Sequence, residues 1–237
     1  MAELFPAMTE ELAELTGTIL GDGCLSTYVA KTENRRRFEI AYTGHIHDEA
    51  HYLDFIQPMF MKYFGVKGNL SRRKTCNAVQ FHVKSKRVFE YFNSLGIPVG
   101  EKGKVLEIPN QILDNPAFAL ACVRGIWDTD GSVYPRYSKK YKNHAKHYSH
   151  YAVLGLRMKS RVIMQVREIL VAEGIFCNKL LLQRDGAFAL RITNQEVIKK
   201  YFSLIGFRNQ YHTDRLSAIK QSLDLNGFHP TCFEKGL

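Results

Sequence analysis

The sequence lacks the features of a small secreted domain, a structural zinc site or a membrane protein. Its five cysteines are scattered singly with no C-x-x-C pair, which argues against zinc and favours a reducing compartment. No apolar run approaches the roughly 20 residues that cross a bilayer, and the N-terminus MAELFPAMTEEL lacks the basic-then-apolar order of a signal peptide. We therefore expect an intracellular protein, in the cytoplasm or an organelle matrix, that is not secreted.

Acidic residues are absent from two long stretches of an otherwise mixed sequence. The net charge is +10, and residues 65–87 and 131–167 contain no Asp or Glu. Tyr and His are interleaved with Lys and Arg in these stretches, a pattern typical of proteins that contact phosphates and base edges. The charge distribution predicts a polyanionic partner.

Two segments of the chain resemble each other at an offset of 108 residues. Leu12–Ser26 reads LAELTGTILGDGCLS and Leu120–Tyr134 reads LACVRGIWDTDGSVY. Both carry small residues at helical spacing, namely Ala13, Gly17 and Gly21 in the first and Ala121, Gly125 and Thr129 in the second. Such stripes let two helix backbones pack closely, so we expect the two segments to form a pair of packed helices.

Each of these segments ends in Asp-Gly. Asp22 and Asp130 fall in the last helical turn, where Gly23 and Gly131 are expected to adopt the left-handed conformation that ends many helices. Two carboxylates brought together at the negative ends of two helix dipoles repel each other. A shared divalent cation removes this repulsion, and oxygen ligands with open positions for water and phosphate suit magnesium.

The remaining pattern repeats in the same order after each segment. Apolar periodicity predicts strands at 24–30 and 35–43, a helix at 48–64, strands near 68–73 and 77–84, and a helix at 85–95. The second half repeats this with strands near 132–138 and 148–158, a helix at 161–173, strands near 175–183 and 187–193, and helices at 195–204 and 211–223. This is a duplicated αββαββα unit, with residues 99–116 as a linker.

The paired motifs LTGTILGDG and VRGIWDTDG resemble those of the LAGLIDADG homing endonucleases, specifically the intron-encoded, single-chain type with two motifs. The resemblance implies an α+β fold in which duplicated αββαββα units form two curved antiparallel sheets, a DNA-binding saddle around a pseudo-twofold axis. The halves would be residues 1–98 and 117–237, joined by the linker 99–116. The expected partner is double-stranded DNA, bound by a monomer that needs neither a protein partner nor a membrane.

The resemblance further implies a site-specific double-strand DNA endonuclease that hydrolyses phosphodiesters with Mg²⁺. Two or three ions, replaceable by Mn²⁺, would be shared by Asp22 and Asp130 with help from the carbonyls of Gly21 and Thr129. In the family a lysine often follows the glycine that ends the last helix of a repeat by six residues. That position holds Lys102 in the first half, where Lys104 is close enough to compete with it, but His212 in the second, which puts the equality of the two strand-cleaving centres in question.

Two further positions near the motifs are assigned from the repeat. Lys159, where a strand meets the next helix, is expected to be a second basic group of the catalytic site. Asp128 aligns with Leu20 of the first motif, so we interpret it as structural or, at most, as a residue that supports a metal ligand.

Polar residues that alternate with apolar ones, together with nearby basic residues, form the predicted DNA-contacting set. In the first half these are Ser26, Tyr28, Arg35, Arg37, Arg72, Arg73, Lys74, Gln80, His82 and Lys84. In the second half they are Tyr134, Arg136, Ser138, Lys140, Arg157, Arg184, Arg191 and Thr193. Side chains of these kinds reach base edges and phosphates in a major groove.

A binding protein of the same fold, either an RNA maturase or a DNA-binding regulator, is the alternative. The two repelling carboxylates favour the nuclease, because a protein that only binds has no need of them. An intein is disfavoured, since residue 1 is neither Cys nor Ser and the chain does not end in His-Asn. The residues do not indicate which DNA sequence is the target.

Overall fold

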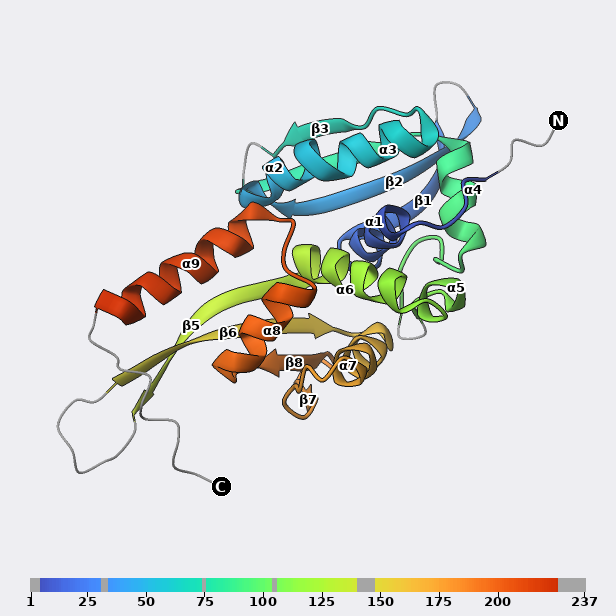
Figure 1. The fold of residues 1–237 in the computed structure, drawn as a ribbon. Helices are drawn as coiled ribbons and strands as arrows, with labels where there is room; N and C mark the ends of the chain where they lie inside the picture. Colours follow the sequence, from blue (N-terminus) through green and yellow to red (C-terminus); the bar gives the residue numbers. More distant parts are fainter. Residues whose placement is uncertain (1–4, 31–33, 74–75, 104–105, 140–147, 226–237) are drawn as a thin grey trace.

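Two helices lie side by side between two antiparallel sheets (Figure 1). The computed structural model describes residues 5–30, 34–73, 76–103, 106–139 and 148–225. The central helices are α1 (Glu10–Gly21) and α6 (Pro116–Asp130). The side chains of Thr9 and Asn115 accept hydrogen bonds from the first free backbone N–H groups of α1 and α6, respectively.

Glycines allow the backbones of α1 and α6 to touch. A Cβ atom added to Gly17 would collide with the Cys122 carbonyl, and one added to Gly125 would collide with the Glu14 carbonyl. At Gly21 an added Cβ would collide with the Thr129 hydroxyl. The small-residue stripes therefore pack against each other as the sequence predicts.

The first half forms a four-stranded sheet in the order β1-β2-β4-β3. Its strands are β1 (Gly23–Ala30), β2 (Arg35–His45), β3 (Asn69–Arg72) and β4 (Ala78–Val83). A helical path joins β2 to β3 through a 3-10 turn (Ile46–Asp48), α2 (Glu49–His51), a π-helical turn (Tyr52–Ile56) and α3 (Gln57–Phe64), and α4 (Lys86–Ser94) follows β4. The predicted helix at 48–64 is thus present but interrupted by the π-helical turn.

The second half repeats this order as β5-β6-β8-β7. Its elements are β5 (Gly131–Lys139), β6 (Tyr148–Met158), α7 (Val162–Ala172), β7 (Leu181–Leu182), β8 (Phe188–Ile192), α8 (Gln195–Leu204) and α9 (Gln210–Leu225). The predicted duplication is confirmed by the identical strand orders. None of the described helices has both the length and the apolar character needed to cross a membrane.

The strand expected at 175–183 is reduced to Leu181–Leu182. These two residues pair with Ala189 and Phe188 of β8, whereas Phe176 is 67% exposed. Asn178 adds one backbone hydrogen bond to the Arg191 carbonyl. The strand is therefore short because most of its predicted length has no ladder partner.

The two Asp-Gly glycines serve a different purpose from the one predicted. Gly131 has a φ of −81°, and Gly23 is not among the glycines with positive φ, so neither is left-handed. A Cβ atom on Gly23 would collide with Ile19, and one on Gly131 would collide with Trp127. These glycines are needed because the chain turns back against the last helical turn as it enters β1 or β5.

The segment between the halves is packed into the core. Leu106, Ile108 and Ile112 are buried, and α5 (Asn110–Leu113) lies within the segment. The backbone N–H of Ile108 donates to the Gln165 side chain of α7 at 2.8 Å. The segment therefore connects the two halves through buried contacts as well as through the chain.

Candidate functional site

The close packing of α1 and α6 brings Asp22 and Asp130 together. Asp22 caps the C-terminus of α1 and Asp130 is the last residue of α6. Both residues are half-buried, and their carboxyl groups are close enough for the Asp130 charge to raise the pKa of Asp22. The structure thus confirms that the two motif carboxylates meet at one end of the helix pair.

Burial and crowding disfavour ionisation of this pair. Burial raises the pKa of Asp22 well above its usual value, and the neighbouring carboxylates of Asp130 and Asp48 raise it further. Burial also raises the pKa of Asp130, against the opposing effect of Lys102. Two carboxyls that resist ionisation at adjoining helix ends form a site that a cation would stabilise.

Lys102 lies at the same end of α1. Its Nζ donates to the Leu20 carbonyl at 2.9 Å and to the Gly21 carbonyl. Burial lowers the pKa of Lys102, whereas Asp130 and Asp22 raise it. The structure therefore places the predicted lysine beside both carboxyls, and the Gly21 carbonyl that we expected to help hold a metal is bonded to this lysine.

The corresponding end of α6 has Asn209 and His212 where the end of α1 has Lys102. The side-chain amide of Asn209 donates to the Asp128 carbonyl at 3.0 Å, as Lys102 does to the Leu20 carbonyl. His212 is buried beside it, and neither ring nitrogen has a hydrogen-bond partner of good geometry among the described residues. Burial lowers the pKa of His212, although Asp48 and the Asp128 backbone raise it. The two helix ends are therefore chemically unequal.

Asp128 has a structural role, as predicted. Its side chain is 1% exposed and accepts a hydrogen bond from the Arg208 backbone N–H at 2.9 Å. Burial raises the pKa of Asp128 to about 7. The carboxyl therefore holds the chain before α9 against α6.

The sequence interpretation missed two residues that contact the site from outside the motifs. Tyr52 is fully buried in the π-helical turn, and its hydroxyl donates to Asp22 Oδ2 at 3.4 Å. Asp48 accepts a hydrogen bond from Asn209 at 3.0 Å, which joins the first half to the end of α6. Tyr52 lies within the segment 48–64, for which the sequence predicts only a helix, and π-helical turns often occur near functional positions.

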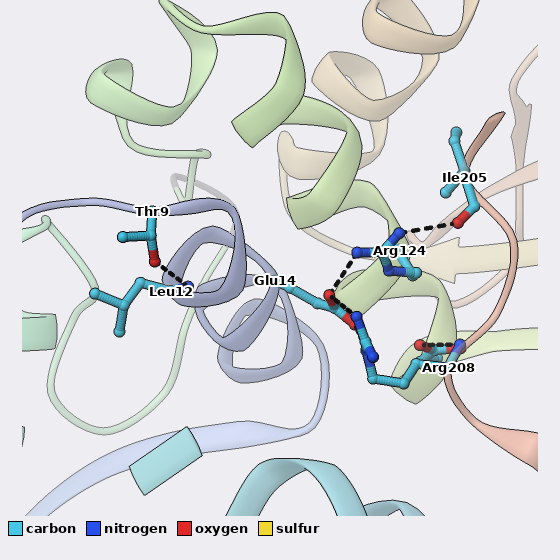
Figure 2. A network of polar contacts seen from close by, with 7 residues as sticks. Thr9, Leu12, Glu14, Arg124, Ile205 and Arg208 are labelled. Atoms are coloured by element: carbon cyan, nitrogen blue, oxygen red, sulfur yellow. Dashed lines mark hydrogen bonds and ion pairs between the residues drawn. The ribbon is translucent and has the colours of Figure 1, made fainter. Parts of the chain in front are cut away.

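A second polar network joins the halves behind the site. Figure 2 shows Glu14 of α1 between two arginines, Arg124 of α6 and Arg208 of the segment before α9. Glu14 is fully buried, with contacts of 2.6 Å to Arg124 and of 2.5 and 3.0 Å to Arg208. Arg124 also donates to the Ile205 carbonyl at 3.1 Å. This network holds α1, α6 and the C-terminal segment in one arrangement, which fixes the relative position of the two carboxyls.

Strand register brings most of the predicted DNA-contacting residues of the first half onto one face. Leu25 of β1, Ile40 of β2 and Phe81 of β4 point into the core. The opposite face carries Ser26, Tyr28, Arg35, Arg37, Gln80 and His82, and the same alternation extends to Arg73 and Lys84 beyond the strand ends. This face is the polar face of the first sheet.

The second sheet has an equivalent polar face. Ser132 and Tyr134 of β5 lie across from Gly155 and Val153 of β6, and Arg191 of β8 also pairs with Gly155. A side chain at Gly155 would press on the Tyr134 ring. Arg136, Arg157, Arg191 and Thr193 share this face with Tyr134, and Ser138 occupies the next register position along β5.

Several predicted contacts do not join these faces. Arg72 lies across from the core residue Val79, and its guanidinium binds Glu49 of α2 at 2.7 Å, so we remove it from the DNA-contacting set. Arg184 is exposed in the turn after β7, outside the strands. Arg157 does lie on the polar face, where it is paired with Asp185 at 2.6 Å. Lys74 and Lys140 lie outside the described residues.

Lys159 is not joined to the carboxyl pair by any of the described contacts. It is exposed just beyond β6, at a position that corresponds to His45 at the end of β2, because Leu156 and Tyr42 make equivalent pairs with Gly131 and Gly23. Its catalytic role remains a prediction.

The carboxylate oxygens at the helix ends fit a hard divalent cation whose coordination shell is completed by other ligands. No group of three or more His, Cys, Asp or Glu side chains within the described part of the chain is placed to hold a metal ion. Mg²⁺ is commonly bound through one or two carboxylates together with water and substrate phosphates. Asp22 and Asp130 match that requirement, and the remaining positions would be left for phosphate and water.

Comparisons with known proteins identify the fold. The structure of I-DmoI in complex with DNA and Mn matches with a TM-score of 0.57 and 20% identity, over 83% of this chain and 96% of that one. The LAGLIDADG meganuclease I-AabMI bound to uncleaved DNA matches with a TM-score of 0.59 and 16% identity, over 92% and 91%. Both comparisons cover the two halves, so the chain has the fold of the LAGLIDADG homing endonucleases, as the motif resemblance implied.

Sequence comparison adds little. No protein-family model matches the chain. One curated relative, which belongs to the A-type ATP synthase of Pyrococcus abyssi, is 23% identical over 125 residues, which are 52% of this chain and 11% of that protein. The chain thus spans about a tenth of the length of that relative.

Proposed function

We propose that this chain is a site-specific double-strand DNA endonuclease that acts with a divalent metal. The observation that carries the proposal is the meeting of Asp22 and Asp130 at the adjoining ends of α1 and α6, with Lys102 beside them. Two antiparallel sheets, each with a polar face directed away from the core, lie on either side of these helices (Figure 1). The solved structures of the same fold include complexes with DNA and Mn or Ca, which supports the same partners here.

The residues at the helix ends would divide the work of phosphodiester hydrolysis. Asp22 and Asp130 would hold Mg²⁺, or Mn²⁺ in its place, which supplies an activated water and neutralises charge at the phosphate. The Lys102 ammonium would add a fixed positive charge where the phosphate enters. Tyr52 would hold the Asp22 carboxyl in place through its hydrogen bond. The number of ions, two or three, is part of the proposal.

The sheets would bind duplex DNA on their polar faces and the chain would act as a monomer. Each half supplies one central helix and one sheet, so the two halves together complete the site. The Glu14 network crosses between the halves within a single chain. A second copy is therefore not needed to bring the carboxyls together.

The test is a selection of cleavage sites from a randomised or genomic DNA pool in the presence of Mg²⁺. The proposal predicts that cut molecules share one long, asymmetric sequence with both strands broken. A selected DNA that is bound but never cut would support the alternative binding protein. If no DNA is enriched at all, the proposed function is wrong.

Salt is expected to weaken DNA binding steeply, because many of the proposed contacts join Lys or Arg to phosphate. With at least six such contacts, the logarithm of affinity should fall against the logarithm of salt concentration with a slope of about −5 or steeper. Binding to the selected DNA, measured over a salt series in Ca²⁺, checks this. Lys84→Ala should reduce the slope by about 1, whereas Arg72→Ala should leave it unchanged because Arg72 lies on the helix-covered side of its sheet.

Replacing Lys102 with Met is expected to slow the cutting of one strand more than the other. The end of α1 has a lysine whereas the end of α6 has Asn209 and His212, so only one of the two centres loses a charged group. Cleavage of that strand should fall about 100-fold, and nicked DNA should accumulate on a supercoiled plasmid that carries the target. Lys104→Met is measured beside it, because Lys104 is the other lysine that the spacing allows in this role. Equal slowing of both strands by Lys102→Met would contradict an unequal site.

A further inference from the structure

One acidic side chain lies on a face that should meet a polyanion. Glu39 of β2 alternates with the core residues Phe38 and Ile40, which puts its side chain on the polar face of the first sheet. The residue is 8% exposed, so its carboxylate lies below the surface of that face. A carboxylate in this position weakens phosphate binding unless it has another purpose.

Glu39 binds two of the side chains that the sequence nominates for DNA contact. Its Oε1 is 2.5 Å from Nδ1 of His82 on β4, and its Oε2 accepts a hydrogen bond from the Tyr28 hydroxyl on β1 at 3.3 Å. These contacts reach the two strands that flank β2 in the sheet. Both partners remain accessible, with the His82 side chain 25% exposed and Tyr28 43% exposed.

The two contacts determine which atoms are left to face a ligand. A carboxylate only accepts hydrogen bonds, so Nδ1 of His82 carries a proton, and in the neutral tautomer Nε2 is left as an acceptor. The Tyr28 hydroxyl donates its only proton in the hydrogen bond to Glu39, which leaves its oxygen lone pairs as acceptors. With the His82 ring neutral, Glu39 thereby converts two groups that can either donate or accept into two acceptors, held on the two strands that flank β2.

We propose that Glu39 is a positioning residue for base readout, which orients Tyr28 and His82 as acceptors for exocyclic amino groups in the major groove. The groups that donate there are N6 of adenine and N4 of cytosine, whereas guanine offers only acceptors. The inference rests on the proposed function and adds the chemistry of the bases that this part of the first sheet selects.

The test measures the binding of the selected DNA and of every single base-pair variant of it. The measurements use Ca²⁺ at about pH 8, where an imidazole is ordinarily neutral. Glu39→Gln keeps the size of the side chain but offers both a donor and an acceptor, so neither partner is oriented any longer. We expect the preference for an adenine or cytosine at one or two adjacent positions to fall about tenfold, with the preferences elsewhere unchanged.

Three further variants separate positioning from a general effect. Glu90→Gln removes the same charge from an exposed ion pair with Lys86 on α4, and it should leave every preference unchanged. His82→Ala should lose the preference at one of the affected positions, and adding Glu39→Gln to it should cause no further loss there. Tyr28→Phe should lose the preference at the other position.

The outcomes are distinct. An equal loss of affinity for all target variants in Glu39→Gln, or preferences that do not change, would overturn the inference while leaving the nuclease intact. If the parent protein selects no DNA, the proposed function itself fails. Should Glu39→Gln not fold, the His82→Ala and Tyr28→Phe variants still decide the matter. They identify the base pairs that His82 and Tyr28 read. If the parent protein prefers guanine there, or has no preference, the acceptor assignment is wrong.

Discussion

Replacing Asp22 or Asp130 with Asn is expected to abolish cleavage while the protein still folds and binds DNA. Asn is a neutral and weaker ligand for Mg²⁺ than a carboxylate. Changes in groups that merely support a metal ligand cost about 10- to 100-fold, so the loss here should exceed about 100-fold. DNA binding in Ca²⁺ should persist because the polar faces of the sheets are untouched, and cleavage in Mg²⁺ measured beside it separates the two effects.

The same two variants should hold or gain stability. The folded-state pKa values of Asp22 and Asp130 are raised, so the folded protein binds protons more tightly than the unfolded chain. The stability that these groups contribute is complete below their unfolded pKa and is lost as pH rises through the folded pKa. Asn has no charge to bury at neutral pH, so thermal melting should show an unchanged or higher Tm.

Asp128→Asn is the matched control for these variants. Asp128 lies two residues before Asp130 on the same helix and has a raised pKa of about 7. The Asn side chain that replaces it should therefore also be tolerated or stabilising at neutral pH. Its oxygen can still accept from the Arg208 backbone, and cleavage should continue near the parental rate. The shared-metal proposal is contradicted if Asp22→Asn or Asp130→Asn cuts both strands as fast as this control.

Replacing Glu14 with Gln is expected to be the most destabilising of the conservative changes considered. Glu14 is fully buried between Arg124 and Arg208, so the neutral amide leaves two guanidinium groups without their counter-charge. Removing one partner from a buried ion pair typically costs about 3–5 kcal/mol, and for a chain of this length that lowers Tm by roughly 10 °C. Urea unfolding and thermal melting measure the effect.

Glu196→Gln is the control for the Glu14 variant. Glu196 pairs with Lys199 on α8, but its side chain is 77% exposed, and exposed pairs of this kind contribute about 0–1 kcal/mol. The two substitutions therefore remove the same charge from very different surroundings. A Glu14→Gln variant no less stable than Glu196→Gln would show that the network does not hold the halves together.

The sequence by itself determined the duplication and the meeting point of the halves. Small residues recur every four positions around Gly17 and around Gly125, and a helix places residues four apart on one stripe whatever the rest of the chain does. This spacing predicts a close contact between the two helices. Asp22 and Asp130 follow at fixed distances from those glycines, so their juxtaposition was predictable. Alternation also assigned Tyr28, Gln80 and His82 to one face, since side chains on a strand alternate strictly.

The tertiary structure alone decided which partner each polar group finds. Glu14 looks like an isolated acid in an apolar helix, and its partners Arg124 and Arg208 are 110 and 194 residues away. Asn209 reaches the Asp128 carbonyl, and Glu39 reaches Tyr28 and His82, only because separate elements are packed at a particular register. Periodicity reports which face a residue occupies, whereas a hydrogen bond depends on distances of a few tenths of an ångström that only the packed structure sets.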